Sequence, residues 1–354
     1  MIACLRPLRL LALTALCMTL CGAPRAYSTD TATGKGTVYY LAPTLFDEFQ
    51  TESMRYIETT FGSIGYKVTT LDAQNRADLQ LNQLDNVIIF KPAAVVIAAV
   101  DYDSVLPGID AARAAGIRVL VYDRQITGTR VDFTSVVGTV EIGRISAAEV
   151  LRLLNERRSG AEGLVLQITG DPGDSYTLDI QKGFDEEIAT YPGVRVITKA
   201  AMQWEPTNAG DIVENQLLVN EDIDLIFVHA AHLAVPIVGI LEARGRKPGQ
   251  VMMASTGGLP VGLELIRQGW IQVDVEQPLY AQIRGMAMFM DKIIAGDSLA
   301  IGNYEVTGLQ ARLVSEKWGP TLVIPGRAVS LENVEETRFW GNQQPPADLV
   351  KVLK

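Results

Sequence analysis

The sequence predicts an α/β protein with parallel sheets covered on both faces, and three observations lead to that class. Short β-branched apolar runs alternate along the chain with segments whose apolar residues recur at helical spacing. The strand candidates are continuously apolar, which is typical of parallel strands that carry helices on both faces of their sheet. The chain has 354 residues, which is long enough for two domains of ordinary size.

Eight strand candidates follow one another, and helical segments such as EIGRISAAEVLRLLNERR (141–158) and PVGLELIRQG (260–269) lie between them. In sheets of this kind, ligands bind beyond the carboxyl ends of the strands, where the loops gather. Polar residues directly after a strand are therefore candidate ligand contacts. The strand candidates are TVYYLA (37–42), YKVTTLD (66–72), AVVIAA (94–99), RVLVYD (118–123), GLVLQIT (163–169), VRVITKAA (194–201), LIFVHA (225–230) and VMMAST (251–256).

The first residues have the pattern of a secretory signal peptide, predicted over 1–28. Two arginines precede an apolar stretch, Leu10 to Leu20, and small residues follow it. This stretch is too short for an ordinary membrane-spanning helix, which is the alternative interpretation. Lipid attachment at Cys21 is disfavoured, because the bulky Leu20 stands before it. All three cysteines lie in this leader, so the exported chain is expected to be stabilised by its core alone.

Composition and motifs exclude several functions. The net charge of -10 argues against a nucleic-acid partner, since phosphate binding needs a basic face. The stretch GDPGDS (170–175) lacks the lysine and the spacing of a nucleotide loop, and no nucleophile stands beside a base, so neither an enzyme nor a cofactor is predicted. His229 and His232 have no cysteine or obvious third ligand beside them, so no metal site is predicted.

The strand RVLVY ends on an acid beside a base, Asp123 and Arg124. A carboxylate can accept from two hydroxyls, and a guanidinium can donate to two oxygens in one plane. The position after a buried strand therefore suits a pair that faces a ligand. A structural ion pair or a helix cap is the alternative.

Six stretches in this order and spacing carry a resemblance to a known family. From about residue 36 to residue 308, the sequence resembles the periplasmic sugar-binding proteins of ABC importers, the ribose-binding group in particular. The tail sequence VSLENVEETRFWGN (329–342) also looks like endings seen among these proteins. The stretches are IGYKVTTLDAQN (64–75), VYDRQITG (121–128), EGLVLQITG (162–170), QKGFDEEI (181–188), LIFVHAAHLA (225–234) and VDVEQPLYAQIRG (273–285).

The resemblance implies two similar doubly wound parallel-sheet lobes joined by a three-segment hinge. The first lobe is expected from 34–138 plus 278–305, the second from 139–277 plus 306–330, and a tail from 331–354.

Carried over from the family, the crossovers fall near 138–139, 277–278 and 305–308. A small-molecule ligand is expected in the cleft, and the lobes close over it by a hinge motion. By the same resemblance, the protein is a periplasmic monomer whose closed form is recognised by an ABC permease in the inner membrane.

The family also implies site residues. Asp123 and Arg124 match the pair that holds sugar hydroxyls, and Gln277 matches a ligand contact at a crossover. Phe49 and Trp204 match the aromatic rings that sandwich the sugar, because the C–H faces of a ring sugar are apolar.

Departures from the family pattern fall mostly in the second lobe. Asp47 replaces a usual asparagine of the first lobe, as Ala98 does another. Leu178 stands where an arginine is usual, and the common HND after the seventh strand is HAA (229–231). The usual DG after the eighth strand is Gly257 and Gly258. Replacement contacts are expected from His229, Tyr176 and Thr256, with His232, Ser255 and Asp179 as further candidates.

These observations predict a solute-binding protein that feeds an ABC importer with a sugar, a polyol or a less polar sugar-like compound. Two alternatives stay open. One is a sensor subunit of the same fold that signals to a chemoreceptor or a histidine kinase. The other is a binder of a non-sugar, more apolar ligand, because three lost hydrogen bonds at roughly 1 to 3 kcal/mol each are too many for an unchanged pentose. A transcriptional repressor of related fold is excluded by the secretion signal at the amino terminus.

Overall fold

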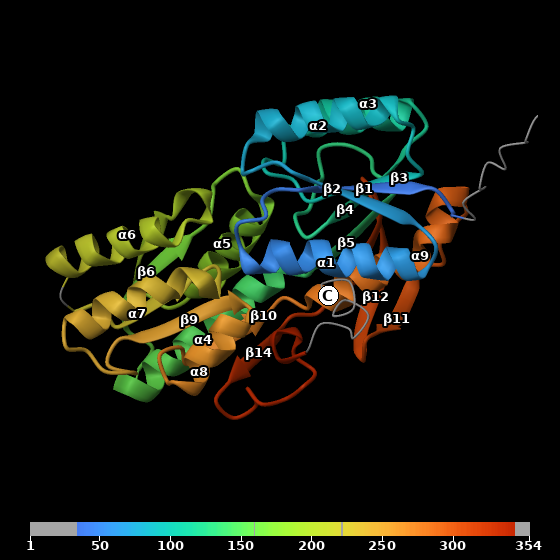
Figure 1. Cartoon of the computed structure of the whole chain (residues 1–354). Helices are drawn as coiled ribbons and strands as arrows, with labels where there is room; N and C mark the ends of the chain where they lie inside the picture. The colour runs from blue at the N-terminus through green and yellow to red at the C-terminus, as the bar shows by residue number, and fades with distance from the viewer. Residues whose placement is uncertain (1–33, 159, 221, 344–354) are drawn as a thin grey trace, which may run out of the picture. The chain divides into compact units, whose positions relative to one another are not determined.

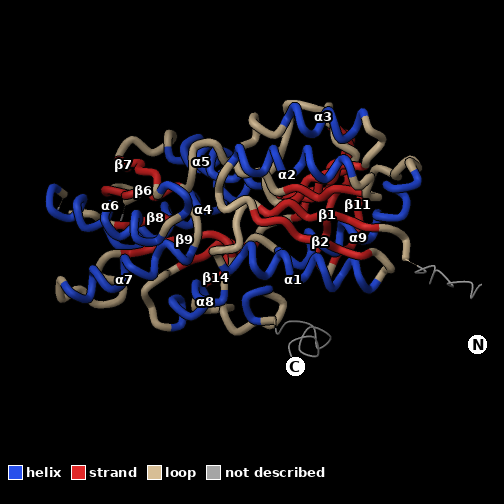
Figure 2. Tube along the Cα trace, turned by 45° about the horizontal axis from the view of Figure 1, so that its top comes forward, coloured by secondary structure: helices blue, strands red, loops and turns tan. Residues whose placement is uncertain are grey.

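A computed structural model describes residues 34–158, 160–220 and 222–343 (Figure 1). The predicted secretion signal and the last residues of the tail, 344–354, lie outside the described residues. Within the described ranges, the chain forms two parallel-sheet lobes, each with helices on both sides of its strands (Figure 2). This is the predicted fold class. No helix in these ranges is both long and apolar enough to cross a membrane.

Sheet A, the sheet of the first lobe, has eight strands. Its central strands are parallel, and two strands at one edge run antiparallel to their neighbours. The order across sheet A is β11 (Gly302–Val306), β12 (Leu309–Glu316), β13 (Gly319–Ile324), β5 (Phe133–Val137), β4 (Arg118–Tyr122), β3 (Ala94–Ile97), β1 (Thr37–Ala42) and β2 (Lys67–Asp72).

Helices cover both faces of sheet A (Figure 1). Helices α1 (Glu48–Ser63) and α9 (Leu279–Ala295) pack together on one face, and α2 (Ala77–Ile89) and α3 (Leu106–Ala114) pack together on the other. Neighbouring residues of a strand point to opposite faces of the sheet, because the strand is pleated. In β1, Tyr40 packs into the core on the α1 side and Leu41 into the core on the α2 side.

Sheet B, the sheet of the second lobe, has six strands, all parallel except the edge strand β14. The order across sheet B is β14 (Arg327–Ser330), β10 (Val273–Glu276), β9 (Met252–Gly257), β8 (Leu225–Val228), β6 (Gly163–Thr169) and β7 (Val194–Ala200). The α-helices of this lobe are α4 (Thr139–Arg158), α5 (Ser175–Ile188), α6 (Pro206–Val219), α7 (Ala234–Ala243) and α8 (Pro260–Arg267).

Helices α4 and α5 approach each other closely because two glycines lie at their contact. A Cβ atom at Gly143 would stand 2.2 Å from the Ile180 carbonyl oxygen, and one at Gly183 would stand 1.9 Å from the Val140 carbonyl oxygen. Neither position has room for a side chain. These contacts hold the middle of α5 against α4. The amino end of α5, capped by Asp174, lies beside Arg124 of the first lobe.

The chain passes between the sheets three times: after β5, after β10, and between β13 and β14. The third passage corrects the sequence prediction, which placed a crossover near 305–308 and assigned 306–330 to the second lobe. Strand β13 pairs in parallel with β5, so residues 302–324 extend sheet A, and β14 alone of this segment joins sheet B. Leu313 of β12 is fully buried in the core shared with α9.

The described part of the tail packs against both lobes through Trp340, in the short 3₁₀ helix η3 (Trp340–Asn342). The Trp340 backbone N–H donates to Glu276 Oε1 (2.8 Å), and its indole Nε1 donates to the Gly257 carbonyl oxygen (2.7 Å). The indole ring meets Phe49 of α1 edge-on, with ring centroids 5.8 Å apart. Trp340 is therefore held by the second lobe and buttresses a ring of the first.

Candidate ligand-binding site

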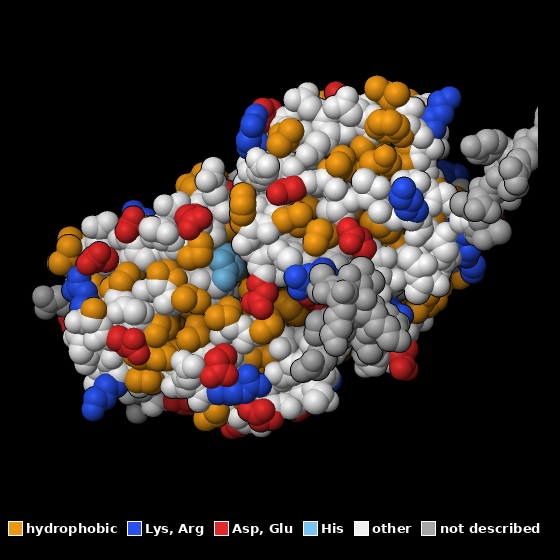
Figure 3. Space-filling model, in the orientation of Figure 1, with side chains coloured by type: hydrophobic (Ala, Val, Ile, Leu, Met, Phe, Trp, Pro, Cys, Tyr) orange, Lys and Arg blue, Asp and Glu red, His pale blue; other side chains and the backbone are white. Residues whose placement is uncertain are grey.

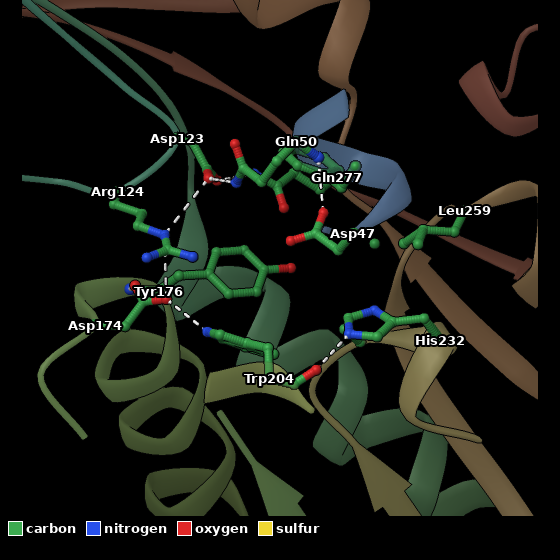
Figure 4. A pocket seen from close by; sticks show the side chains of 13 residues that line it. Asp47, Gln50, Asp123, Arg124, Asp174, Tyr176, Trp204, His232, Leu259 and Gln277 are labelled. Carbon is green, nitrogen blue, oxygen red and sulfur yellow. Dashed lines mark hydrogen bonds and ion pairs between the residues drawn. The ribbon is translucent and has the colours of Figure 1, made fainter. Parts of the chain in front are cut away.

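A pocket lies where the carboxyl ends of the parallel strands of both sheets meet (Figure 4). Its cavity volume is about 40 Å³, enough for about three water molecules, so a sugar-sized ligand requires the lobes to part. Two further 3₁₀ helices, η1 (Met202–Trp204) and η2 (Ala231–Leu233), place residues at its second-lobe wall. The lining residues are Asp47, Phe49, Gln50, Asp123, Arg124, Asp174, Tyr176, Trp204, Ala230, His232, Gly257, Leu259 and Gln277.

Asp47 begins the first-lobe wall as the N-cap of α1. Its Oδ1 accepts from the Gln50 backbone N–H (2.7 Å), which satisfies one of the unpaired donors of the first helical turn. The cap sets the direction of the turn that carries Phe49 and Gln50 into the pocket. Burial raises the pKa of Asp47, although His232 and backbone N–H groups oppose that shift.

Asp123 follows β4 in a left-handed conformation, with φ of 65°. Aspartate tolerates this region better than most residues. Its carboxylate accepts from Gln50 Nε2 (2.9 Å) and from Gln277 Nε2 (2.5 Å), so two side-chain amides from different segments hold it. Burial is the largest influence on Asp123 and raises its pKa, while Arg124 and the two amides lower it.

Arg124 is buried and joins the two lobes. Its Nη1 donates to the Ala99 carbonyl oxygen (3.0 Å), and its Nε lies 3.1 Å from Asp174 Oδ2 in the second lobe. The same Nε lies 3.8 Å from Asp123 Oδ2. The guanidinium of Arg124 therefore lies farther from the carboxylate of Asp123, its sequence neighbour, than from the carboxylate of Asp174 in the second lobe.

Asp174 is the N-cap of α5, and its carboxylate accepts from the Tyr176 backbone N–H (2.9 Å) and from Trp204 Nε1 (3.1 Å). Despite these donors and Arg124, burial raises the pKa of Asp174 to about 7. Proton uptake at Asp174 is thus expected near neutral pH.

Aromatic side chains from both lobes line the pocket. Trp204 and Tyr176 lie with ring centroids 6.1 Å apart in the second-lobe wall, and Phe49 lies in the first-lobe wall. The indole of Trp204 fits only because residue 170 is glycine: a Cβ atom there would stand 2.1 Å from the ring. The backbone of Trp204 is itself in the left-handed region, with φ of 54°.

His232, at the start of the helix after β8, closes one side of the pocket. Its Nε2 lies 3.0 Å from the Trp204 carbonyl oxygen, and its Nδ1 is buried without a partner among the described residues. Figure 3 shows a histidine side chain at the surface between the two lobes. Of the two histidines, His229 has no exposed surface and His232 is partly exposed.

Seven of the nine residues predicted from the sequence line this one pocket: Asp47, Phe49, Asp123, Arg124, Tyr176, Trp204 and Gln277. His229 and Thr256 do not. The imidazole of His229 turns into the core toward Gln167, with Nε2 to Nε2 at 3.1 Å, and burial lowers its pKa to about 3. Thr256 donates its hydroxyl to the His229 carbonyl oxygen (2.6 Å) and lies behind Tyr176.

The first turn of α5 carries both Tyr176 and Leu178. Tyr176 faces the pocket, whereas Leu178 is 37% exposed and does not line it. The arginine expected from the family pattern is therefore absent from this wall, and Tyr176 occupies it.

Sequence reasoning missed Gln50 and Asp174. Both lie in the first turn or at the cap of a helix that follows a strand, which is the signal that could have identified them. Asp174 lies in the GDPGDS stretch, and comparing this stretch with a nucleotide loop does not reveal a ligand contact. Leu259, Ala230 and Gly257 supply apolar or backbone surface, and no chemical signal in the sequence singles them out.

The fold and the pocket define a two-lobed α/β protein that binds a ligand between its lobes. A family model described as "Periplasmic binding protein domain" matches residues 38–298. The chain belongs to this family.

Relatives and solved structures agree with that assignment. The chain is 21% identical over 271 residues to a ribose import binding protein of Salmonella typhimurium, covering 76% of this chain and 88% of the relative. It is 25% identical over 285 residues to a xylitol-binding protein of Mycolicibacterium smegmatis, covering 80% of this chain and 78% of the relative. A Bacillus halodurans ABC transporter solute-binding protein with bound myo-inositol superposes with a TM-score of 0.74 at 22% identity, covering 86% of this chain and 98% of that one.

Proposed function

We propose that this protein captures a small polyhydroxylated ligand, a sugar or a polyol, in the pocket between its lobes. The observation that carries the proposal is the pocket itself. Carboxylates, a guanidinium and two side-chain amides lie among three aromatic rings at the carboxyl ends of two parallel sheets. The polar groups suit hydroxyls, and the rings suit the apolar C–H faces of a sugar.

Binding is coupled to movement of the lobes, since the cavity is smaller than a sugar. Arg124 and Asp174 face each other across the two lobes, and a ligand between them must part these groups or bridge them. The passages after β5, after β10 and between β13 and β14 are the segments that can absorb such a motion.

A thermal-shift screen of the purified protein tests this function. The panel includes D-ribose, xylitol, myo-inositol and D-arabinose, together with hexoses and with more apolar compounds. A ligand that binds only the folded state stabilises it by about 2.7 kcal/mol at 100 times its Kd. We expect at least one sugar or polyol to raise the melting temperature. If only apolar compounds do so, or no compound does, the proposal is wrong.

We further propose that the protein works as a periplasmic monomer and delivers its ligand to an ABC importer in the inner membrane. The family assignment and the import-protein relatives support this role. Uptake of the ligand found in the screen should be lost in a strain that lacks the gene, and should return with the wild-type copy. Unchanged uptake with loss of a ligand-dependent response would instead identify a sensor.

A further inference from the structure

The pocket lining has more negative than positive charge. Among the described residues that line it, three are acidic (Asp47, Asp123 and Asp174), and Arg124 is the one arginine or lysine. The charge of Arg124 is shared, because it lies 3.1 Å from Asp174 and 3.8 Å from Asp123. Asp171 adds a fourth carboxylate whose charge acts on the same guanidinium. Arg124 is the one permanent cation of this set, and His232, the other basic group of the lining, offsets the charge of Asp47 only when it is protonated.

The hydrogen-bond donors of the lining are largely used inside the protein. Both glutamine amides donate to Asp123, and the indole N–H of Trp204 donates to Asp174. The orientation of these amides is fixed by chemistry, since a carboxylate only accepts. The donors left for a ligand on the lining side chains include the second amide hydrogen of Gln50 and the Nη2 group of Arg124, which have no partner among the described residues.

The hydroxyl of Tyr176 is committed in the same way. Thr256 gives its hydrogen to the His229 carbonyl oxygen (2.6 Å), so Thr256 Oγ1 can only accept from Tyr176 Oη, 3.2 Å away. The Tyr176 oxygen is left with lone pairs, which accept.

The unmatched polar atoms at the pocket are also acceptors. The Trp204 carbonyl requires a hydrogen on His232 Nε2, so in the neutral ring Nδ1 holds a buried lone pair without a partner. The second carboxylate oxygen of Asp47 points away from its helix cap and toward the pocket interior (Figure 4). The acceptor atoms and the negative charge of the pocket lining both favour a ligand rich in N–H or O–H donors.

We infer that the ligand is a cation: a sugar or polyol that carries a protonated amine, which Asp47 accepts on the open side of the pocket. This inference rests on the proposed sugar or polyol binding and names the chemistry of that ligand. An ammonium group has three donors and no acceptor, so it matches the acceptors of Asp47, Tyr176 and His232 better than a hydroxyl does. Burial raises the pKa of all three lining aspartates, so each is costly to keep charged until a cation lies beside it.

Isothermal titration with matched pairs tests the inference. Each pair differs by one amine in place of one hydroxyl: D-glucosamine and D-glucose, D-galactosamine and D-galactose, and 1-amino-1-deoxy-D-sorbitol and D-sorbitol. We expect at least one amine to bind roughly tenfold or more tighter than its hydroxyl partner. N-acetyl-D-glucosamine keeps an N–H but no charge, and it should not share the gain.

The variant Asp47→Asn removes the charge but keeps an oxygen that can cap α1, so the helix should form normally. It should abolish most of the preference for amines, with a smaller effect on the hydroxyl partners. Glu48→Gln is the matched control: it removes an equal charge one residue away, from an exposed side chain that does not line this pocket. That variant should keep the preference.

Two outcomes overturn the inference and leave the proposed function intact. One is a neutral sugar or polyol that binds while its amine partner binds no better. The other is an equal change of the preference for amines in Asp47→Asn and Glu48→Gln. That result would show that the negative charge of this region as a whole, and not a contact with Asp47, causes the preference. If no sugar, polyol or amine of either panel binds, the proposed function itself fails.

Discussion

Arg124 lies among carboxylates from both lobes, and its removal would leave buried charges without a partner. At pH 8, Arg124→Met should lower the free energy of unfolding of the unliganded protein by about 3 kcal/mol and should abolish ligand binding. The penalty should shrink below pH 6, because Asp174, whose pKa burial raises to about 7, can then take up a proton.

Chemical denaturation at both pH values measures these effects. Arg113→Met is the control, because its ion pair with Asp132 (3.3 Å) is partly exposed and should contribute little. An Arg124 variant with full apo stability at pH 8 would show that the ion pair with Asp174 is not formed in solution.

Buried acids should also make the apo protein more stable at pH 5 than at pH 7.5. Burial raises the pKa of Asp174 to about 7 and that of Asp274 to about 6, so the folded state binds more protons than the unfolded state between about pH 4 and these values. Stability therefore falls as pH rises through this window. His229 acts in the opposite sense below about pH 6.5, since burial lowers its pKa to about 3. Burial also raises the pKa of Asp179 and Glu276 to about 6, so His229 is one group against four.

Calorimetry between pH 4.5 and 8 checks this sign. Asp274→Asn should flatten the profile in part, since it removes one of these acids while leaving an oxygen to accept from the Gly258 N–H. A melting temperature that rises steadily from pH 5 to 7.5 would contradict the assignment.

At the scale of elements, the segment from β6 to α5 positions the second-lobe wall. Gly170→Ala should push the Trp204 indole out of the pocket, because the new methyl group would occupy the place of the ring. We expect ligand affinity to fall roughly tenfold or more, with a modest loss of stability from overpacking of about 1 to 3 kcal/mol.

Titration of the ligand from the screen against this variant measures the effect. Gly239→Ala, on α7 with no atom within 4 Å of a new Cβ, should bind normally and should be slightly more stable. Equal binding by both variants would show that Trp204 contributes nothing to recognition.

Most of the elements could be predicted from the sequence, but β5 and β10 to β14 were not among the strand candidates. The eight runs correspond to β1 to β4 and β6 to β9. Buried strands among them leave an apolar pattern, whereas the edge strands β2 and β7, which have no buried residue, are marked by β-branched residues. Strands β11 and β12 alternate exposed and buried residues and pair with each other, so they resemble a separate hairpin rather than an extension of sheet A. Which sheet they join depends on the long-range pairing of β13 with β5, and no local pattern encodes it.

The residues of the candidate site could likewise be predicted only in part. Residues directly after strands, such as Asp123 and Trp204, could be predicted because chain position fixes which edge of the sheet they reach. His229 also follows a strand, yet its side chain turns into the core, where Gln167 meets it. Successive residues of a strand point to opposite faces, so a shift of one position turns a pocket residue into a core residue. Sequence position alone does not determine which face the side chain takes.

For the whole molecule, few polar contacts join the lobes at the cleft. Besides Arg124 and Asp174, Asn75 Nδ2 donates to the Gln203 carbonyl oxygen (3.1 Å), and the Tyr102 backbone N–H donates to the Gly173 carbonyl oxygen (3.1 Å). These contacts stabilise the closed arrangement and not the individual lobes. Loss of the Asn75 or Tyr102 contact should thus change ligand affinity more than stability, whereas loss of Arg124 also leaves buried carboxylates without a partner.

Asn75→Asp tests this distinction. Aspartate tolerates the left-handed backbone at this position (φ of 56°) but cannot donate, and it sets two acceptors against each other. Affinity for the ligand of the screen should fall roughly three- to tenfold through faster dissociation, with the melting temperature of the apo protein nearly unchanged. Stopped-flow and thermal melts measure the two quantities, and a large loss of apo stability with intact affinity would show that the contact belongs to the fold rather than to closure.

The position of Trp204 makes the protein an optical reporter of its own ligand. Its indole is 7% exposed, lines the pocket and gives its N–H to Asp174, whose protonation and contacts must change when a ligand enters. Emission from this ring should shift in wavelength or intensity on binding, without any attached dye. Trp204→Phe would assign that part of the signal, and the remaining tryptophans (Trp270, Trp318 and Trp340), none of which lines this pocket, would supply the internal reference.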